Sequence, residues 1–322
     1  MPASPNYIAA QEKALGWEPV GEICQVSGPE AAKFLNAYVT QDILKLVESQ
    51  IAPAAFLTQK GKLISEAWVL RRPGRFLLLF PPGYGAKTGE HLATFLLFAN
   101  VEWSPTEAWA HFAAIGPGST ALLEGALGGQ LSADPGTVLS RGLEGQELLL
   151  FASDRFGLPG WEILVPASAA GAWRQKMEAW IGQGLMARAD PGTLQTLRIE
   201  AGLPAMGVDM SEDNLVAEVG LDAGATSFNK GCYLGQETTA RVQSRGHVNR
   251  KLARLRWQGQ IPSLPAELFQ GEKKVGTLSS AAESPKAGGS LGLGMVALSA
   301  WEKPEPIFFK DGNQEIAIER WT

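Results

Sequence analysis

Cysteine and histidine are scarce in this 322-residue chain, which has two cysteines, Cys24 and Cys232, and three histidines, at positions 91, 111 and 247. Two thiols cannot supply the four thiolates of a structural zinc site or an iron–sulfur cluster. The histidines are scattered, so we expect no metal site. Two cysteines this far apart also give no disulfide framework, and free thiols in a reducing compartment are the expectation.

Long apolar runs are absent as well, because none approaches the roughly 20 residues of a membrane-spanning helix. The first residues carry no basic region followed by an apolar core, so the sequence predicts no secretory signal. A content of 45% hydrophobic and 19% charged residues is typical of globular proteins. We therefore expect a cytoplasmic protein of two or three domains.

The order of the predicted elements indicates α+β lobes. Residues 63–70 and 75–80 read as strands joined by a Pro73-Gly74 turn, and a helical pattern follows at 90–98. A second strand pair, at 147–151 and 161–165, precedes a helix at 169–181. Strand, strand, helix predicts helices laid on one face of a sheet.

Two further helices have recognisable starts. Ser27-Gly-Pro-Glu30 has the form of a capping box and predicts a helix that runs to about Val39. Asp190-Pro191 combines an acceptor at the N-cap with a proline at the first helical position, followed by a buried stripe at Leu194, Leu197 and Ala201.

After Arg250 the sequence changes to short strands. Apolar residues at 253, 255 and 257 alternate with arginines, which predicts a strand with one buried face. Further strands are expected at 273–278, 291–298, 306–309 and 315–318, the last two joined across Asp311-Gly312. We predict a small antiparallel barrel, a domain division into residues 1–245 and 246–322, and a surface loop at 281–290.

Residues 228–250 concentrate the chemistry. Cys232 follows Gly231 and lies two residues after Lys230; it could be a small buried hydrophobe or a thiol activated by a nearby cation. A basic band could hold an anion, bind RNA phosphates or form a solvated strand face, and the net charge of −5 argues against direct nucleic acid binding. The band comprises Lys230, Arg241, Arg245, Arg250, Lys251, Arg254 and Arg256.

The run Lys230-Gly-Cys-Tyr-Leu-Gly-Gln-Glu237, with Ala240-Arg241 and Arg245-Gly-His-Val-Asn-Arg250, resembles the signature of the YgfZ family, folate-binding relatives of the glycine cleavage T-protein. Residues 26–35 and 197–204 are similar to that family's first and central helices. The resemblance implies an α+β, three-lobed T-protein-like ring around a tetrahydrofolate site, closed by a small antiparallel β-barrel. It also implies support of iron–sulfur client or assembly proteins and of a cluster-dependent tRNA methylthiolation enzyme.

The same resemblance suggests site residues. Glu162 matches the carboxylate that binds the pterin ring in the T-protein, and Arg198 matches the second arginine of its Arg-Asp-x-Leu-Arg segment, the first being Leu194 here. Cys232 matches the motif cysteine needed for activity. The remaining cofactor-binding candidates are Lys230, Tyr233, Gln236, Glu237, Arg241 and Arg245.

One departure concerns catalysis. The position of the T-protein's essential aspartate is Ser65 here, and serine cannot replace an ionised carboxylate in proton transfer. Glu66 is displaced by one position and, on a strand, faces the other way. The leading hypothesis is therefore a folate-binding accessory protein that uses the Cys232 thiol. A folate-dependent one-carbon transferase or demethylase and a folate-free docking scaffold are the alternatives.

Overall fold

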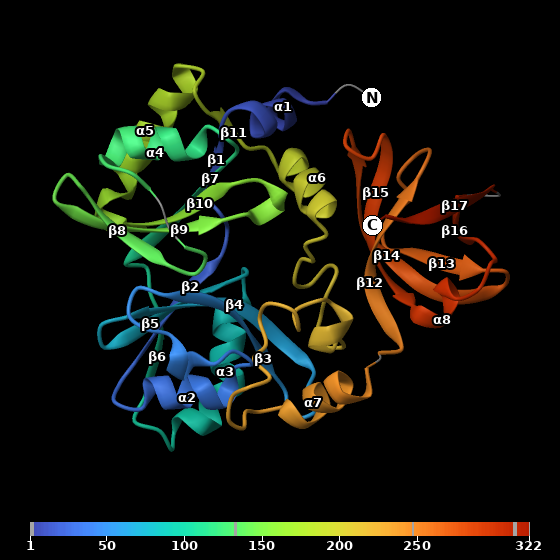
Figure 1. The fold of residues 1–322 in the computed structure, drawn as a ribbon, viewed down its shortest axis with the longest axis horizontal. Helices are drawn as coiled ribbons and strands as arrows, with labels where there is room; N and C mark the ends of the chain where they lie inside the picture. The colour runs from blue at the N-terminus through green and yellow to red at the C-terminus, as the bar shows by residue number, and fades with distance from the viewer. Residues whose placement is uncertain (1–2, 132–133, 247, 312–313, 322) are drawn as a thin grey trace.

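Two β-sheets and a closed β-barrel, each with its own hydrophobic core, make up the fold (Figure 1). The computed structural model describes residues 3–131, 134–246, 248–311 and 314–321. The chain starts in the second sheet with strand β1, builds the first sheet from β2 to β6, and returns to the second sheet from β7 to β11. The two sheets are therefore interleaved in sequence.

The first sheet is five-stranded, in the order β3-β4-β5-β2-β6. Its neighbouring strands are all antiparallel. Helices α2 and α3 pack on one face through a core that includes Phe34, Leu35, Val69 and Leu78. The bounds are β2 Glu22–Ser27, α2 Ala31–Tyr38, the 3₁₀ turn η1 Ile43–Lys45, β3 Ile51–Leu57, β4 Leu63–Arg72, β5 Arg75–Phe80, α3 Tyr84–Leu96 and β6 Glu102–Pro105. We call this unit the first lobe.

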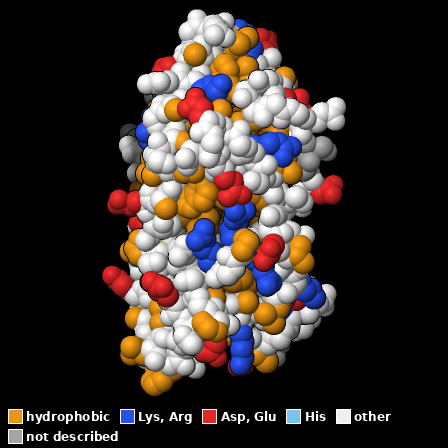
Figure 2. All heavy atoms as spheres, turned by 90° about the vertical axis from the view of Figure 1, so that its left-hand side faces the viewer, with side chains coloured by type: hydrophobic (Ala, Val, Ile, Leu, Met, Phe, Trp, Pro, Cys, Tyr) orange, Lys and Arg blue, Asp and Glu red, His pale blue; other side chains and the backbone are white. Residues whose placement is uncertain are grey.

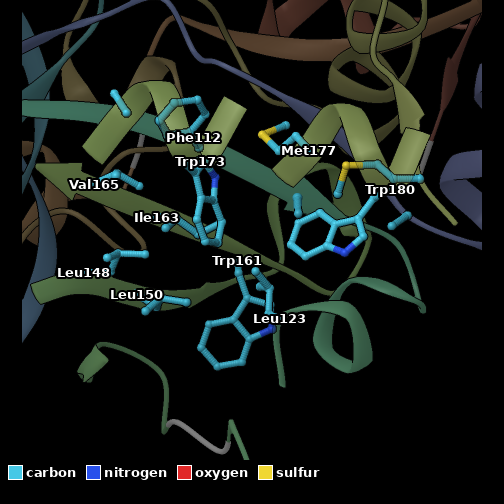
Figure 3. Packing of buried hydrophobic residues seen from close by; sticks show 14 of the residues in the cluster. Phe112, Leu123, Leu148, Leu150, Trp161, Ile163, Val165, Trp173, Met177 and Trp180 are labelled. Carbon is cyan, nitrogen blue, oxygen red and sulfur yellow. The ribbon is translucent and has the colours of Figure 1, made fainter. Parts of the chain in front are cut away.

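The second sheet is six-stranded, in the order β11-β1-β7-β10-β9-β8, and carries α4 and α5. Its core, seen in Figure 3, packs Trp161 and Ile163 of the sheet against Trp173, Met177 and Trp180 of α5. The bounds are β1 Leu15–Trp17, β7 Trp109–Ile115, α4 Ser119–Leu127, β8 Val138–Leu143, β9 Gln146–Ser153, the 3₁₀ turns Arg155–Gly157 and Ala167–Ala169, β10 Gly160–Pro166, α5 Ala170–Gly182 and β11 Ala187–Arg188. This unit is the second lobe.

The two sheets contact each other through the faces that their helices leave uncovered. Leu70 and Leu77 of the first sheet share a buried cluster with Leu149, Phe151 and Leu164 of the second. We call these two facing surfaces the inner faces. On each strand the side chains alternate between the inner face and the helix-covered face, so a residue's register decides which of the two it reaches.

The barrel closes with six antiparallel strands in the order β12-β15-β14-β13-β16-β17. Ala253, Leu255 and Trp257 point into its core, as their alternation predicts. The strands are β12 Arg250–Trp257, β13 Ala266–Gln270, β14 Lys273–Ser284, β15 Gly289–Ala297, β16 Ile307–Asp311 and β17 Gln314–Trp321, with the short helix α8 at Leu298–Trp301. The domain division at residue 246 stays a prediction.

Three helices and a 3₁₀ turn connect the lobes to the barrel. The helices are α1 Pro5–Glu12, α6 Pro191–Ala201 and α7 Gln236–Arg245, and the turn η4 is Val216–Glu218. Figure 1 shows α6 between the second lobe and the barrel, and α7 at the foot of the first lobe. Asp190 caps α6 as predicted, because its side chain accepts a hydrogen bond from the Thr193 amide.

Some local predictions are wrong. Glu30, not Ser27, is the N-cap of α2, and its carboxylate accepts from the Asn100 amide instead of closing a capping box. The predicted loop at 281–290 is too long, because β14 runs to Ser284, β15 begins at Gly289, and only residues 285–288 form a turn. The helix α7 and the strand β13 were not foreseen. The predicted turn at Asp311-Gly312 falls partly outside the described residues.

The surface on the β8 and β5 side mixes charges of both signs. Figure 2 shows Lys and Arg side chains there interspersed with Asp and Glu. Arg72 of β4 and Glu147 of β9 form a 2.8 Å ion pair between the two lobes. This face therefore has no broad area of one sign that would attract a polyanion. Across the described residues, no helix is both long enough and apolar enough to span a bilayer.

Candidate functional site

Glu162 lies in the middle of β10, between Ala113 of β7 and Phe151 of β9 in the sheet register. Leu164, two residues on, belongs to the cluster between the sheets, so the alternation of the strand places Glu162 on the inner face as well. Its side chain is 5% exposed. A carboxylate this buried is not the solvated strand-end group that a surface glutamate would be, and it needs hydrogen-bond donors.

The ring of His111 provides one nitrogen within hydrogen-bond distance of the Glu162 carboxylate. Its Nε2 lies 2.7 Å from Oε2 of Glu162, and its side chain is 16% exposed. His111 stands opposite Leu164 in the β7–β10 register, which puts it on the same face as Glu162. Sequence reasoning missed this residue because nothing in the sequence says that β7 pairs with β10. Together the two form a buried acid–imidazole pair on the inner face.

Ser65 and Glu66 lie on opposite faces of β4. Ser65 is fully buried on the helix-covered face, where its hydroxyl is 2.7 Å from that of Thr88 in α3. Trp68, two residues beyond Glu66, contacts the Phe151 ring across the inner face at 5.8 Å. Glu66 shares the register of Trp68, so the inward-facing carboxylate of this strand is Glu66. Ser65 is a packing residue.

Lys230 is bound to the first lobe. Its ammonium donates to the main-chain oxygens of Asn36, Val39 and Gln41, at 2.6, 2.8 and 2.7 Å. Those carbonyls lie at the end of α2 and just after it, where a helix leaves its last acceptors unsatisfied and where a cation is favoured. The nitrogen also lies 4.9 Å from the centre of the Tyr233 ring.

The surroundings of Lys230 match its protonated, charged form. Burial lowers the pKa of Lys230 to about 8, and the charge of Asp42 opposes the decrease. An ammonium carries three protons, and the three carbonyl oxygens take one each. Lys230 is therefore held as a cation at neutral pH and uses its donors inside the protein, which leaves none for a bound anion.

The rest of the motif surrounds this attachment. Leu234 donates its amide to Ala37 of α2, and Tyr233 is buried in a core with Ala55 and Leu57 of β3. Cys232, between Lys230 and Tyr233, is exposed with a free thiol. The segment thus docks on the first lobe while its cysteine faces outward.

The helix that follows carries the polar motif residues. Gln236 opens α7, with its amide bonded to the Tyr233 carbonyl. Glu237 and Arg241 form an exposed ion pair at 2.5 Å, one helical turn apart. The side chain of Arg245 lies outside the described residues. Ion pairs between exposed side chains contribute little to stability, so Glu237 and Arg241 are available to other partners.

Arg198 is used in packing the barrel against α6. Its guanidinium pairs with the fully buried Asp209 at 2.5 Å and donates to Ser280 of the barrel and to the Leu203 carbonyl. Asp209 in turn accepts from the Ser279 hydroxyl. An arginine with these partners is a buried structural link, and its role as a ligand for an anion stays a prediction.

The structure thus separates the predicted site residues into two groups. Glu162 and His111 belong to the inner face of the second lobe, whereas Lys230, Cys232 and Tyr233 are docked on the first lobe beside α2. Figure 1 places β10 in the second lobe and α7, the helix that follows the motif, at the foot of the first lobe. Tyr233 packs on Ala55 of β3, which stands opposite Glu66 in the β3–β4 register.

The two facing sheets and the closing barrel define the class of protein to which the chain belongs, the aminomethyltransferase T fold. The crystal structure of glycine cleavage system aminomethyltransferase T from Bartonella henselae matches 98% of this chain and 87% of its own, with a TM-score of 0.86 at 20% identity. A family model, the GCVT N-terminal domain, matches residues 19–230. The chain belongs to that family.

Curated relatives carry different names. An aminomethyltransferase from Rubrobacter xylanophilus is 28% identical over 92% of this chain and 81% of its own length. A tRNA-modifying protein YgfZ from Colwellia psychrerythraea is 27% identical over 78% of this chain and 73% of its own. A putative chloroplastic transferase from Arabidopsis thaliana is 29% identical over 86% of this chain, which spans 63% of that relative.

Proposed function

We propose that this chain is a YgfZ-type, folate-binding accessory protein. In this role it binds tetrahydrofolate through Glu162 and uses the exposed Cys232 thiol to support iron–sulfur cluster assembly or repair and cluster-dependent tRNA modification, in the cytoplasm. Its partners are the folate and iron–sulfur client or assembly proteins. The relative named as a tRNA-modifying protein supports this assignment.

The observation that carries the ligand half is the buried Glu162 carboxylate on the inner face. A pterin ring presents adjacent amino and ring N–H donors, and a carboxylate offers two parallel acceptors, which makes a charge-assisted bidentate fit. His111 contacts Oε2 of this carboxylate, and a carboxylate oxygen can accept more than one hydrogen bond. His111 would fix the orientation of the carboxylate, and Trp68 and Phe151 add aromatic surface on the same face.

The thiol half rests on how the motif is docked. Lys230, Tyr233 and Leu234 turn into the first lobe, and Cys232 between them stays exposed. An exposed thiol on a segment with this many contacts can reach a protein partner without local unfolding. Glu162 belongs to β10 and Cys232 to the motif segment, so substitutions at the two positions test folate binding and thiol chemistry separately.

A second candidate function is a folate-dependent one-carbon transferase or demethylase. Glu66 favours it, because a carboxylate on the inner face of β4 could serve in proton transfer where Ser65 cannot. The name of the Rubrobacter relative points the same way. Incubation with tetrahydrofolate and an aminomethylated or methylated donor separates the two candidates, because methylene-tetrahydrofolate accumulates only if the chain is a transferase.

Equilibrium titration with tetrahydrofolate tests the ligand half. We expect saturable binding by the native protein and a loss of at least about tenfold in Glu162→Gln, which keeps the shape and removes the charge. Glu267→Gln, an exposed barrel glutamate, is the matched control and should bind as the native protein does. Absence of saturable binding by the native protein would refute folate binding.

Complementation tests the thiol half. In a strain that lacks its own family member, Cys232→Ser should fail to restore the modified tRNA, while Cys24→Ala, which changes the buried thiol, should restore it. Circular dichroism of both variants checks that they fold like the native protein. Full restoration by Cys232→Ser would remove the thiol from the mechanism, whatever the result of the folate titration.

A further inference from the structure

A cavity of about 630 Å³ lies away from the inner faces, where α1, the start of α6 and the barrel meet. Its wall takes Ser4 and Tyr7 from the N-terminal helix region, Thr193 from α6, and Ser284 and Ser290 from the barrel strands β14 and β15. A molecule bound here would touch three parts of the chain that are distant in sequence. The chemistry of the wall shows which kind of molecule fits.

The hydroxyl groups of this wall have all donated their protons elsewhere. Tyr7 and Ser284 donate to the carboxylate of Glu200, at 2.9 and 2.5 Å. Thr193 donates to Asp190 at 2.7 Å, and Ser4, at 3.2 Å from the Thr193 hydroxyl, is left to donate to it. Thr196 and Ser290 donate to the main-chain oxygens of Glu283 and Gly259. A hydroxyl has one proton and two lone pairs, so these six can only accept.

A buried carboxylate lies directly behind the wall. Glu200 is 5% exposed, and its two oxygens accept hydrogen bonds from the Tyr7 and Ser284 hydroxyls. Among the ion pairs of the described residues none includes Glu200, and Arg254 donates to its main-chain oxygen instead. Burying a charge whose partners are only neutral donors is costly, and a cation bound against the wall would offset that cost.

Two more carboxylates line the cavity itself. Hydrogen bonds from Asn6 and Thr193 lower the pKa of Asp190 to about 2, so it is ionised at every physiological pH. Glu283, on β14, also lines the cavity. No lysine or arginine is among the described residues of the wall, and Lys286, in the nearby turn, is not part of it. The charged side chains among the described residues of the wall are therefore all acidic.

We propose that this cavity binds a small organic cation, an aliphatic amine or diamine, whose N–H donors meet the hydroxyl acceptors of the wall and whose charge compensates Glu200, Asp190 and Glu283. An ammonium group donates and cannot accept, which matches hydroxyl groups that can only accept. The side chains of Gln258 and Gln260 add amide donors and carbonyl acceptors to the same wall. The bound amine would link the barrel to α1 and α6. This site is independent of the folate proposal, because it uses neither Glu162 nor Cys232.

Isothermal titration calorimetry with three molecules of equal chain length tests the charge requirement. The probes are 1,4-diaminobutane, 1,4-butanediol and succinate, which are cationic, neutral and anionic. We expect saturable binding of the diamine, binding of the diol that is at least about tenfold weaker, and no binding of succinate. Equal affinities for diamine and diol, or no diamine binding up to millimolar concentrations, would overturn the proposal.

Variants of the wall locate the binding. Glu283→Gln and Asp190→Asn each remove one charge at the cavity, and each should weaken diamine binding about tenfold. Glu272→Gln removes an equal charge from a barrel turn outside the wall and should leave the affinity unchanged. Glu283 is exposed, so its substitution does not threaten folding. Equal diamine affinities in the Glu283→Gln and Glu272→Gln variants would show that the diamine binds the acidic surface at large, and the site would be rejected.

Discussion

The ammonium nitrogen of Lys230 lies 2.6 Å from the main-chain oxygen of Asn36, although 194 residues separate the two in sequence. Val39 and Gln41 provide its other two acceptors, and Leu234 adds its amide to the Ala37 carbonyl. The end of α2 is thus capped by the motif segment, which lies far from α2 in sequence. Lys230 thus attaches the cysteine-bearing segment to the first lobe, and its role as a cofactor-binding residue stays a prediction.

Replacing Lys230 should loosen this segment. Lys230→Met keeps an unbranched apolar stem but leaves three acceptors at the end of α2 without their donor, so we expect the free energy of unfolding to decrease by about 1–3 kcal/mol. Amide exchange should become faster in residues 228–236 and stay unchanged in β10. Hydrogen exchange with mass spectrometry and urea unfolding measure the two effects.

The matched control for that variant is Lys60→Met, because Lys60 is exposed on the turn beside α7 and its ammonium can be removed at the same change in net charge. Its exchange pattern should be that of the native protein. Lys230→Arg should restore part of the protection, since a planar guanidinium reaches some but not all of the three carbonyls. Native exchange rates in Lys230→Met would show that the carbonyls find other donors and that the attachment does not depend on Lys230.

The His111–Glu162 pair should behave as one energetic unit. His111→Leu removes the partner 2.7 Å from the buried carboxylate, and we expect it to lower the free energy of unfolding by about 1–3 kcal/mol and to weaken tetrahydrofolate binding. Because Glu162→Gln already removes the charge, adding His111→Leu to it should cost less than His111→Leu alone. A double-mutant cycle measures the coupling, and additive effects would mean that the pair does not act together.

Much of the local fold could be predicted from periodicity, whereas the site could not. The strands β4 and β5 and the capped helix α6 follow from alternation, a Pro-Gly turn and the Asp190 N-cap, all signals within a few residues of each other. The partners of Lys230 and of Glu162 come from elements that the sequence does not place. A match to a family motif identifies residues, but it does not show whether each residue binds a ligand or holds the motif in place.

The face reached by Ser65 could not be read from sequence for a more specific reason. A register shift between Phe56 and Leu57 gives β4 one extra residue opposite β3, so counting along the strand from its start misplaces the alternation. The contact of Ser65 with Thr88 places Ser65 on the helix-covered face, and the contact of Trp68 with Phe151 places Trp68 on the inner face.

Ser65 and Glu66 should therefore respond differently to substitution. Ser65→Ala removes a buried hydrogen bond to Thr88 and should lower the free energy of unfolding by about 1 kcal/mol, with no change in tetrahydrofolate affinity. Glu66→Gln changes the charge of the inner face and should alter ligand affinity. Chemical unfolding and titration on the same two variants check this division, which a loss of affinity in Ser65→Ala would contradict.

The cap of α6 gives a pH-dependent prediction. The pKa of Asp190 is lowered to about 2 in the folded protein, mainly by the Asn6 side chain and by Thr193, from an ordinary value near 3.8. A carboxyl whose folded pKa is depressed stabilises the protein above its unfolded pKa, and this contribution is lost as the pH falls from about 4 to about 2. Asp190→Asn keeps one oxygen as acceptor for the Thr193 amide but lacks the second oxygen, which accepts from the Asn6 amide and the Thr193 hydroxyl.

At pH 7 the Asp190→Asn variant should be less stable than the native protein by about 1–2 kcal/mol, and this difference should shrink as the pH approaches 2. Urea unfolding from pH 7 to 2.5 measures it, with Asp213→Asn, an exposed aspartate, as the control. A stability difference that stays constant over that range would mean that the native advantage comes from the geometry of the cap and not from its charge.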